Sequence, residues 1–254
     1  MKSLFTPIMT ASMVIAGCTT PSSTNTSAPD PSTTVNAFCK SISDDIDEKE
    51  NKLKNPEKAI KKLSTCIDYI EKSSNNEALA AMDYLLRSMA YEQLGQYSLA
   101  ISDMEKHISL KGKQKTGRDI VELSALYRNN KQPEKAVSIL QKMFDERLGL
   151  FGKGTTFGMP SYYHLGRALI DLERWEEAAE AFTEGLTYQP DYPWALMYRA
   201  LAYDALGQKS LASADIGKAR DLIDKMQAQD KSKSLEALGK PPFPEFLSKY
   251  PRHR

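Results

Sequence analysis

Reactive side chains are scarce in this chain of 254 residues. It has three histidines and three cysteines, and neither type is spaced as HExxH or CxxC, the patterns of paired metal ligands. A GxSxG elbow, a phosphate-binding loop and a dinucleotide-binding glycine pattern are also absent. The acidic run at residues 44–48 lacks the central glycine and distal glutamate of a calcium loop. We therefore predict that the chain is not an enzyme, and we expect no catalytic residue, no metal and no cofactor.

An excess of charge of one sign is missing as well. The 34 Lys and Arg residues nearly balance 33 Asp and Glu residues, which leaves a net charge of +1. The lysine-rich stretch at residues 49–62 is interleaved with acidic residues, so it is typical of a solvated helix face. Because nucleic-acid binding needs a basic patch or stripe, we expect no nucleic acid among the partners.

The chain also lacks an apolar run long enough to span a membrane. The mostly apolar stretch Leu4–Ala16 has 13 residues and would extend only about 20 Å as a helix, against roughly 30 Å of hydrocarbon. It follows Lys2 and ends in Ile15-Ala16-Gly17-Cys18. A short apolar run after a basic residue and before small residues indicates an export signal over residues 1–17.

Residues 15–18 resemble the lipobox of bacterial lipoproteins. The resemblance implies that Cys18 is acylated after cleavage before it, and Thr19 in the next position favours the outer membrane. The alternative is a cysteine that happens to follow a leader. We therefore expect a lipid-anchored protein on the periplasmic side of the bacterial cell envelope, which contacts the membrane only through its lipid. Of the 18 residues 19–36, 13 are Ser, Thr or Pro, so residues 18–36 are predicted to be a disordered tether with a reach of about 20–25 Å.

A repeat occupies the rest of the chain. Met159–Pro190 and Pro193–Asp224 carry large and small residues at the same intervals, 34 residues apart. Further copies begin at Ala81 and Gly117, and a degenerate one begins near Lys40, with a first helix expected around Ile42 and Ile46. The small position of the second helix is alanine in all copies: Ala59, Ala100, Ala136, Ala178 and Ala212. A fixed period with small residues where two helices touch predicts stacked helix pairs.

This spacing resembles the tetratricopeptide repeat. The resemblance implies an all-α, right-handed solenoid of antiparallel helix pairs over residues 37–230, with about four clear repeats and a degenerate N-terminal one. Ser88, Ser124, Gly166 and Ala200 would be the small contacts on first helices. The third copy has Glu173-Arg174 where others have glycine, so its turn is expected to differ in shape. Residues 231–254 would form a capping helix and a proline-rich tail, which alternatively occupies its own groove or is an exposed docking motif.

Two cysteines remain if Cys18 is acylated. Cys39 and Cys66 would flank the two helices of the degenerate repeat, and an oxidising periplasm favours their pairing in a disulfide. The alternative is a pair of buried thiols that serve as small apolar residues.

In the repeat family, ligands lie along the concave face lined by first helices. The positions that match carry apolar residues in the early copies, which suit adaptable packing, and aromatic residues with arginine later. The residues implied are Met82, Leu85, Met89, Arg118, Arg128, Tyr163, His164, Arg167, Trp194, Met197 and Tyr198. Trp194 and Tyr163 could instead pack only against neighbouring helices. The Lys and Asn pattern of the family's chaperone-tail clamp is absent.

The longest insertion between copies is Leu148–Gly158, with four glycines and two phenylalanines. It is either a tolerated loop or a flap that brings Phe151 or Phe157 to a ligand. The leading functional hypothesis is a scaffold that binds a protein or peptide partner on its concave face, in envelope, secretion or pilus assembly. The alternative is an immunity or inhibitor protein that occludes a periplasmic toxin or enzyme. The sequence does not indicate the oligomeric state.

Overall fold

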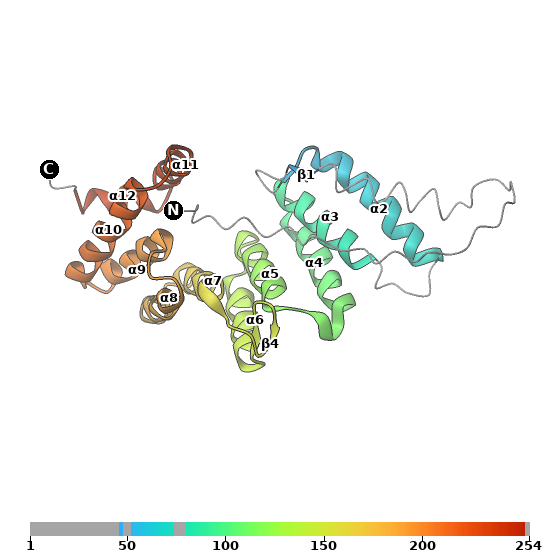
Figure 1. Cartoon of the computed structure of the whole chain (residues 1–254), viewed down its shortest axis with the longest axis horizontal. Coiled ribbons are helices and arrows are strands. Elements are labelled where there is room, and N and C mark those ends of the chain that lie inside the picture. The colour runs from blue at the N-terminus through green and yellow to red at the C-terminus, as the bar shows by residue number, and fades with distance from the viewer. Residues whose placement is uncertain (1–45, 48–51, 74–79, 252–254) are drawn as a thin grey trace, which may run out of the picture. The chain divides into compact units, whose positions relative to one another are not determined.

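A computed structural model describes residues 46–47, 52–73 and 80–251. The predicted signal peptide, Cys18, the tether and Cys39 lie outside these residues. The chain divides into two compact units, residues 1–112 and 113–254, and each is described by itself (Figure 1). Among the described residues, no helix is both long and apolar enough to cross a bilayer.

The described residues of unit 1 form a short hairpin and three helices. Strand β1 (Ile46–Asp47) pairs antiparallel with β2 (Lys52–Leu53), and α2 (Pro56–Ser73), α3 (Ala81–Gln93) and α4 (Tyr97–Lys111) follow. The helix expected around Ile46 is therefore wrong at that residue. The acidic residues on both sides of Ile46 leave no apolar stripe at helical spacing. The backbone N–H of Leu53 instead donates to Gln93 Oε1 at 3.1 Å, which ties the hairpin to α3.

The core of unit 1 lies between α2 and α3. Leu53, Ala59, Leu63 and Cys66 pack there with Ala90, and Cys66 is fully buried. Cys66 is also disulfide-bonded. A cysteine that is both buried and bonded holds α2 in place more firmly than a small apolar residue would.

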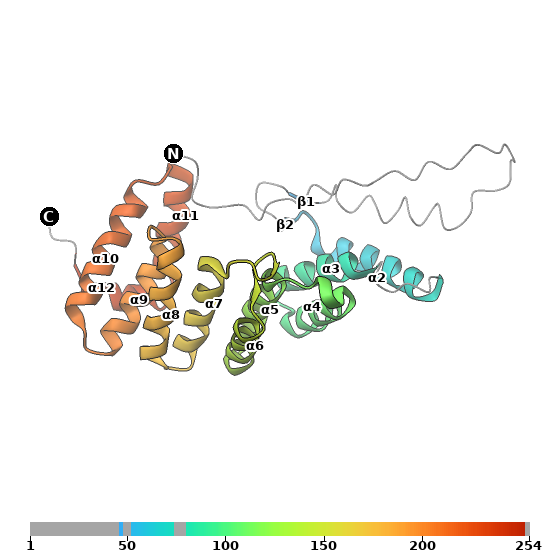
Figure 2. The same ribbon diagram turned by 60° about the horizontal axis from the view of Figure 1, so that its bottom comes forward.

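Unit 2 begins at Lys113, within the 3-10 turn η3 (Gly112–Gln114). Its helices form pairs that lie side by side in chain order, as Figures 1 and 2 both show. They are α5 (Gly117–Asn129) with α6 (Pro133–Asp145), α7 (Gly158–Asp171) with α8 (Trp175–Tyr188), and α9 (Pro193–Ala205) with α10 (Lys209–Asp224). A second hairpin, β3 (Leu148–Gly149) with β4 (Gly152–Lys153), stands between α6 and α7. Two helices end the unit, α11 (Ala228–Leu238) and α12 (Phe243–Ser248).

The small positions are where the paired helices approach most closely. Ala100, Ala136, Ala178 and Ala212 are fully buried, and Ala59 is nearly so. At Gly166 on α7, an added Cβ would lie 2.7 Å from the ring of Phe182 on α8. Any larger residue would push these two helices apart. The spacing predicted that first-helix small residues face the alanines, and Ser88 Oγ does donate to Ala100 C=O at 2.7 Å, but the residue nearest to Gly166 is Phe182 and not Ala178.

The turns between paired helices share one backbone conformation. Gly95 and Gly207 have left-handed φ values of 69° and 74°. Glu173 adopts the same conformation with φ 56°, and Arg174 N–H donates to Leu169 C=O as Gln96 N–H donates to Tyr91 C=O. The expectation of a different turn at Glu173 is therefore wrong. The packing of α7 on α8 imposes the turn, and glutamate accepts the strain that glycine would avoid.

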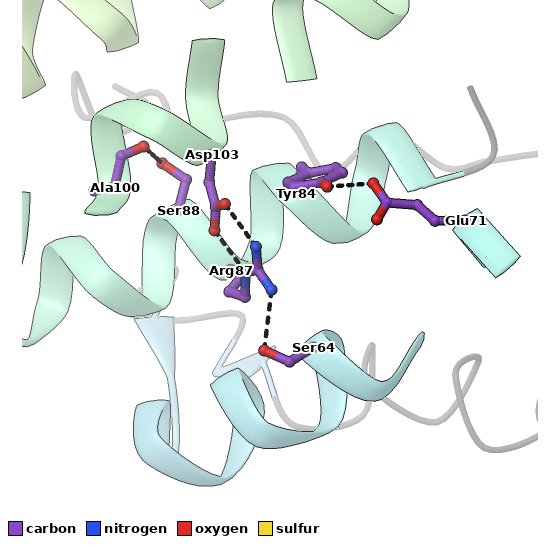
Figure 3. Close-up of polar contacts among 7 residues, drawn as sticks. All are labelled: Ser64, Glu71, Tyr84, Arg87, Ser88, Ala100 and Asp103. Carbon is purple, nitrogen blue, oxygen red and sulfur yellow. Dashed lines mark hydrogen bonds and ion pairs between the residues drawn. The ribbon is translucent and has the colours of Figure 1, made fainter. Parts of the chain in front are cut away.

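Two of the helix pairs contain the same ion pair. Arg87 on α3 donates two hydrogen bonds to Asp103 on α4, and its third bond reaches Ser64 on α2 at 3.0 Å (Figure 3). Arg199 on α9 binds Asp215 on α10 in the same way, with a third bond to Thr183 on α8. Each arginine therefore joins its own pair to the preceding helix, which holds the stacking of the repeats in register.

Candidate partner-binding face

The predicted residues of unit 1 lie on α3. Met82 is 44% exposed, whereas Leu85 and Met89 are half-buried. Between them, burial raises the pKa of Asp83 to about 6. Unit 1 thus offers an apolar strip with one carboxyl group whose pKa burial raises well above its usual value.

In unit 2 the predicted residues meet on what we call the first-helix face, formed by Arg128 on α5, Tyr163 and Arg167 on α7, and Tyr198 on α9. The guanidinium carbon of Arg167 lies 4.3 Å from the centroid of the Tyr198 ring and 5.7 Å from that of Tyr163. Arg167 Nη1 also donates to the hydroxyl of Tyr163 at 3.1 Å. The two tyrosine rings meet edge to face with centroids 5.9 Å apart. Two neighbouring helices therefore form an aromatic cage around one guanidinium group.

Arg128 is tied to the same face by an ion pair. Its Nε and Nη2 atoms both lie 2.7 Å from Asp171 Oδ2, so α5 is bound to the end of α7. The side chain of Arg128 is only 9% exposed. Burial, and then the charge of Arg167, lower the pKa of Arg128, which shows that the two guanidinium groups are close enough to repel.

His164 lies within reach of the charges of both arginines. The residue is half-buried, and its Nδ1 atom is buried and has no hydrogen-bond partner among the described residues. Burial, followed by the charges of Arg128 and Arg167, lowers the pKa of His164 to about 3. The imidazole is therefore neutral at physiological pH, and a buried polar atom next to two arginines is left unsatisfied.

The C-terminal end of the face is covered by the chain's own tail. Phe243 on α12 is 3% exposed, and its ring lies 5.1 Å from Tyr198 and 5.9 Å from Trp194. The tail is anchored further by Asp204, which accepts hydrogen bonds from Lys249 Nζ at 2.9 Å and from the hydroxyl of Tyr250 at 2.7 Å. The proline-rich tail thus forms a short helix on α9, and its aromatic residue lies on two of the predicted partner-binding residues.

Met197 is removed from the candidate site by the structure. It is fully buried, and Tyr198 is only 8% exposed. The family spacing placed Met197 on the exposed side of α9, but the helices packed around α9 enclose it. The accessible part of the face is therefore the part around Tyr163 and Arg167, which are both half-buried.

The hairpin β3–β4 separates the roles of the two phenylalanines of the insertion. Phe157 packs edge to face on Phe144 at 4.7 Å, and Phe144 stacks on Tyr162 at 4.9 Å, so Phe157 belongs to the core. Phe151 is 69% exposed, with the guanidinium of Arg118 at 5.5 Å from its ring. Of the two, only Phe151 is open to a ligand, and Arg118 lies beside it.

A cavity of about 380 Å³ in unit 2 lies away from this face. It is between α10 and the tail and is lined by Ile216, Arg220 and Tyr250 among others. Within the described part of the chain, no group of three His, Cys, Asp or Glu residues is placed to hold a metal ion. The charges and rings of the first-helix face suit the recognition of another molecule's surface.

Two features of the site were not found from the sequence. Arg128 and Asp171 are 43 residues apart, and Trp194 and Phe243 are further apart still, so no short-range pattern connects them. The Arg–Asp pairs of the helix pairs did leave a signal, because Arg87–Asp103 and Arg199–Asp215 have the same separation of 16 residues.

Comparison with known proteins supports the repeat assignment. Family models of the tetratricopeptide repeat match residues 84–114 and 160–192. No curated protein matches the sequence. Among solved structures, a crystal structure of MamA covers 76% of this chain and 94% of its own, with 18% identity and a TM-score of 0.58. MamA from Desulfovibrio magneticus RS-1 covers 68% of this chain and 88% of its own, with 17% identity and a TM-score of 0.56.

A kinesin light chain protein of Podosopora anserina, with nearly identical TPR-like repeats, gives a TM-score of 0.55 at 17% identity. It covers 78% of this chain and 96% of its own. At such identities the likeness concerns the fold alone. The chain contains tetratricopeptide repeats, and its helix pairs have the fold of TPR-like helical solenoids.

Proposed function

We propose that this protein is a lipid-anchored scaffold of the bacterial periplasm that binds a protein or peptide partner on its first-helix faces. The observation that supports it most is the cage of Tyr163, Arg167 and Tyr198, because Arg and Tyr side chains are enriched where protein partners bind most tightly. The repeats at residues 84–114 and 160–192 favour the same function, since tetratricopeptide repeats serve protein–protein interaction. The process served would be envelope, secretion or pilus assembly.

Cysteine chemistry supports an exported location. Disulfides persist in oxidising compartments, and Cys66 is disulfide-bonded. We propose Cys39 as its partner, because Cys18 is the proposed site of acylation. Replacing Cys18 with Ala is expected to give an unprocessed or soluble protein, measured by membrane fractionation and by mass spectrometry of the N-terminus. A variant that stays in the membrane fraction with its lipid would contradict the anchor.

The binding function is tested by site-specific photo-crosslinking in cells. A photoreactive phenylalanine at Tyr163 reports on the first-helix face, and the same residue at Leu211, which is 50% exposed on α10, is the matched control. We expect one discrete adduct from position 163 and none from position 211. No adduct at 163, or equal adducts at both positions, would overturn the assignment of this face. The identity of the adduct separates an assembly component from a toxin, which would indicate an immunity protein instead.

A further inference from the structure

Arg167 differs from the other mostly buried arginines of unit 2 in having no carboxylate of its own. Arg199 is bound by Asp215, and Arg128 by Asp171. Arg167 donates a hydrogen bond to the hydroxyl of Tyr163 and lies on the faces of two rings, and the charge of Asp171 acts on it, but within the described residues no ion pair joins it to a carboxylate. A guanidinium has five N–H donors, so most of those on Arg167 are left for an additional acceptor.

The charges around Arg167 leave one positive charge unbalanced. Asp171 neutralises Arg128 through the ion pair at 2.7 Å, and His164 is neutral. The net charge of Arg128, Arg167, Asp171 and His164 is therefore +1. A single negative charge from outside would balance the group, whereas a doubly charged phosphate would exceed it. A charge in a partly desolvated place is stable only when it is paired and hydrogen-bonded.

His164 lies next to this group and reports on its charge. Its Nδ1 atom is buried and unpartnered, so a ligand from outside does not reach that atom in this structure. The charges of Arg128 and Arg167 both act on its ring, so a charge added beside Arg167 acts on the ring as well. A carboxylate is the acceptor that would satisfy the open donors of Arg167.

We infer that Arg167 binds the carboxylate of an aspartate or glutamate side chain in the protein partner. The inference rests on the proposed function of the first-helix face, and it specifies the partner's chemistry. The half-buried ring of Tyr163 lies beside the guanidinium, whereas Tyr198 is buried on its other side. An apolar residue next to the acid would pack on the ring of Tyr163, so the recognised segment is an acidic residue with an aromatic or aliphatic neighbour.

The chain's own tail is the competing occupant. Phe243 already lies on Tyr198, and Glu245 follows it two residues later on α12. The charge of Glu245 acts on Lys249, however, and within the described residues no ion pair joins Glu245 to Arg167, so the tail brings an aromatic ring to this site but no acid. The tail therefore covers the rings of Trp194 and Tyr198 beside the proposed carboxylate site, but not the site itself.

The direct test uses imidazole NMR of the full chain, in which only three histidines contribute signals. The probes are acetyl-Phe-Glu-amide, its matched neutral form acetyl-Phe-Gln-amide, and sodium acetate. We expect the glutamate peptide to shift the His164 signals saturably and to raise the pKa of His164, because it brings a negative charge beside the ring. The glutamine peptide should bind about tenfold to a hundredfold more weakly.

Variants then separate the site from a general effect of charge. Arg167→Met is expected to abolish the shift and Arg167→Lys to keep part of it. Arg174→Met is the matched control, because Arg174 is exposed on the same unit and pairs only with Glu177. A glutamine peptide that binds as well as the glutamate peptide would overturn the carboxylate site, as would an unchanged response in Arg167→Met. Acetate that binds as tightly as the glutamate peptide would overturn the assignment to a protein side chain.

The crosslinking experiment distinguishes this failure from failure of the function. If the adduct from position 163 forms equally well in Arg167→Met, the face still binds a protein but not through a carboxylate at Arg167. If no adduct forms in the unaltered chain, the proposed function itself is wrong.

Discussion

The ion pair between Arg199 and Asp215 gives the sharpest test of how the repeats are held together. Arg199 Nε and Nη2 lie 2.7 and 2.8 Å from the two carboxylate oxygens, and the side chains are 17% and 11% exposed. Removing one partner of a fully buried pair costs about 3–5 kcal/mol, because the other charge is left unpaired. Since water reaches part of this pair, we expect Asp215→Ala to cost about 2–3 kcal/mol of unfolding free energy.

Replacing both residues should cost far less. The preceding copy carries Leu165 and Ala181 at the equivalent positions, 34 residues earlier, so the chain itself shows that an apolar pair fits there. Arg199→Leu with Asp215→Ala is therefore expected to lie within about 1 kcal/mol of the unaltered protein, despite the lost bond to Thr183. Urea unfolding followed by tryptophan fluorescence measures the double-mutant cycle. If Arg199→Leu alone costs as much as Asp215→Ala, the coupling is about 3 kcal/mol or more. Strictly additive losses would refute the reasoning. Arg174→Ala, at an exposed pair, should cost under about 0.5 kcal/mol.

Three further predictions follow from single positions. Glu173→Gly should raise unfolding free energy by about 1 kcal/mol, because it relieves the left-handed φ of 56°; a lower melting temperature would contradict this. The pKa of His164, lowered to about 3, lies below its unfolded value, so its contribution to stability is complete above pH 6.5 and is lost as pH falls toward 3. His164→Gln should make the free energy of unfolding fall less steeply between pH 7 and pH 4. The same pH dependence in the variant and the unaltered protein would contradict this role of His164. Phe243→Ala should undock α12, with a loss of about 3 kcal/mol of local stability, seen as faster amide exchange at residues 243–248 while α7 stays protected.

The location of the tail has a consequence for binding. Phe243 covers Trp194 and Tyr198, two residues that family spacing assigns to the partner. A partner that binds around Arg167 therefore meets the edge of α12, and Phe243→Ala should alter the affinity of the acidic dipeptide by changing the rings on which its apolar residue packs. Crosslinking from position 163 in this variant shows whether the tail limits access to the face.

The small contacts show how far the sequence alone determines the fold. Ala100, Ala136, Ala178 and Ala212 are buried and Ser88 contacts Ala100, as the repeat spacing predicted, although Gly166 touches Phe182 instead of Ala178. These contacts join residues of one helix pair, whose separation along the chain is fixed by two helices and a turn. Local sequence is sufficient to predict these contacts, because the same spacing recurs in every copy and the two helices of each copy pack in the same way.

The candidate site was predicted in composition but not in arrangement. Family spacing led to Tyr163, Arg167 and Arg128, but it also included Met197, which is fully buried. Tertiary structure alone decided that Asp171 neutralises Arg128, that Phe243 covers Trp194, and that Arg167 has no carboxylate. Charge pairing and burial depend on which side chains from distant segments meet. The periodicity of a helix does not indicate those contacts. The sequence by itself thus determined the repeated helix pairs, whereas the three-dimensional packing decided which charges are balanced and which one is left for a partner.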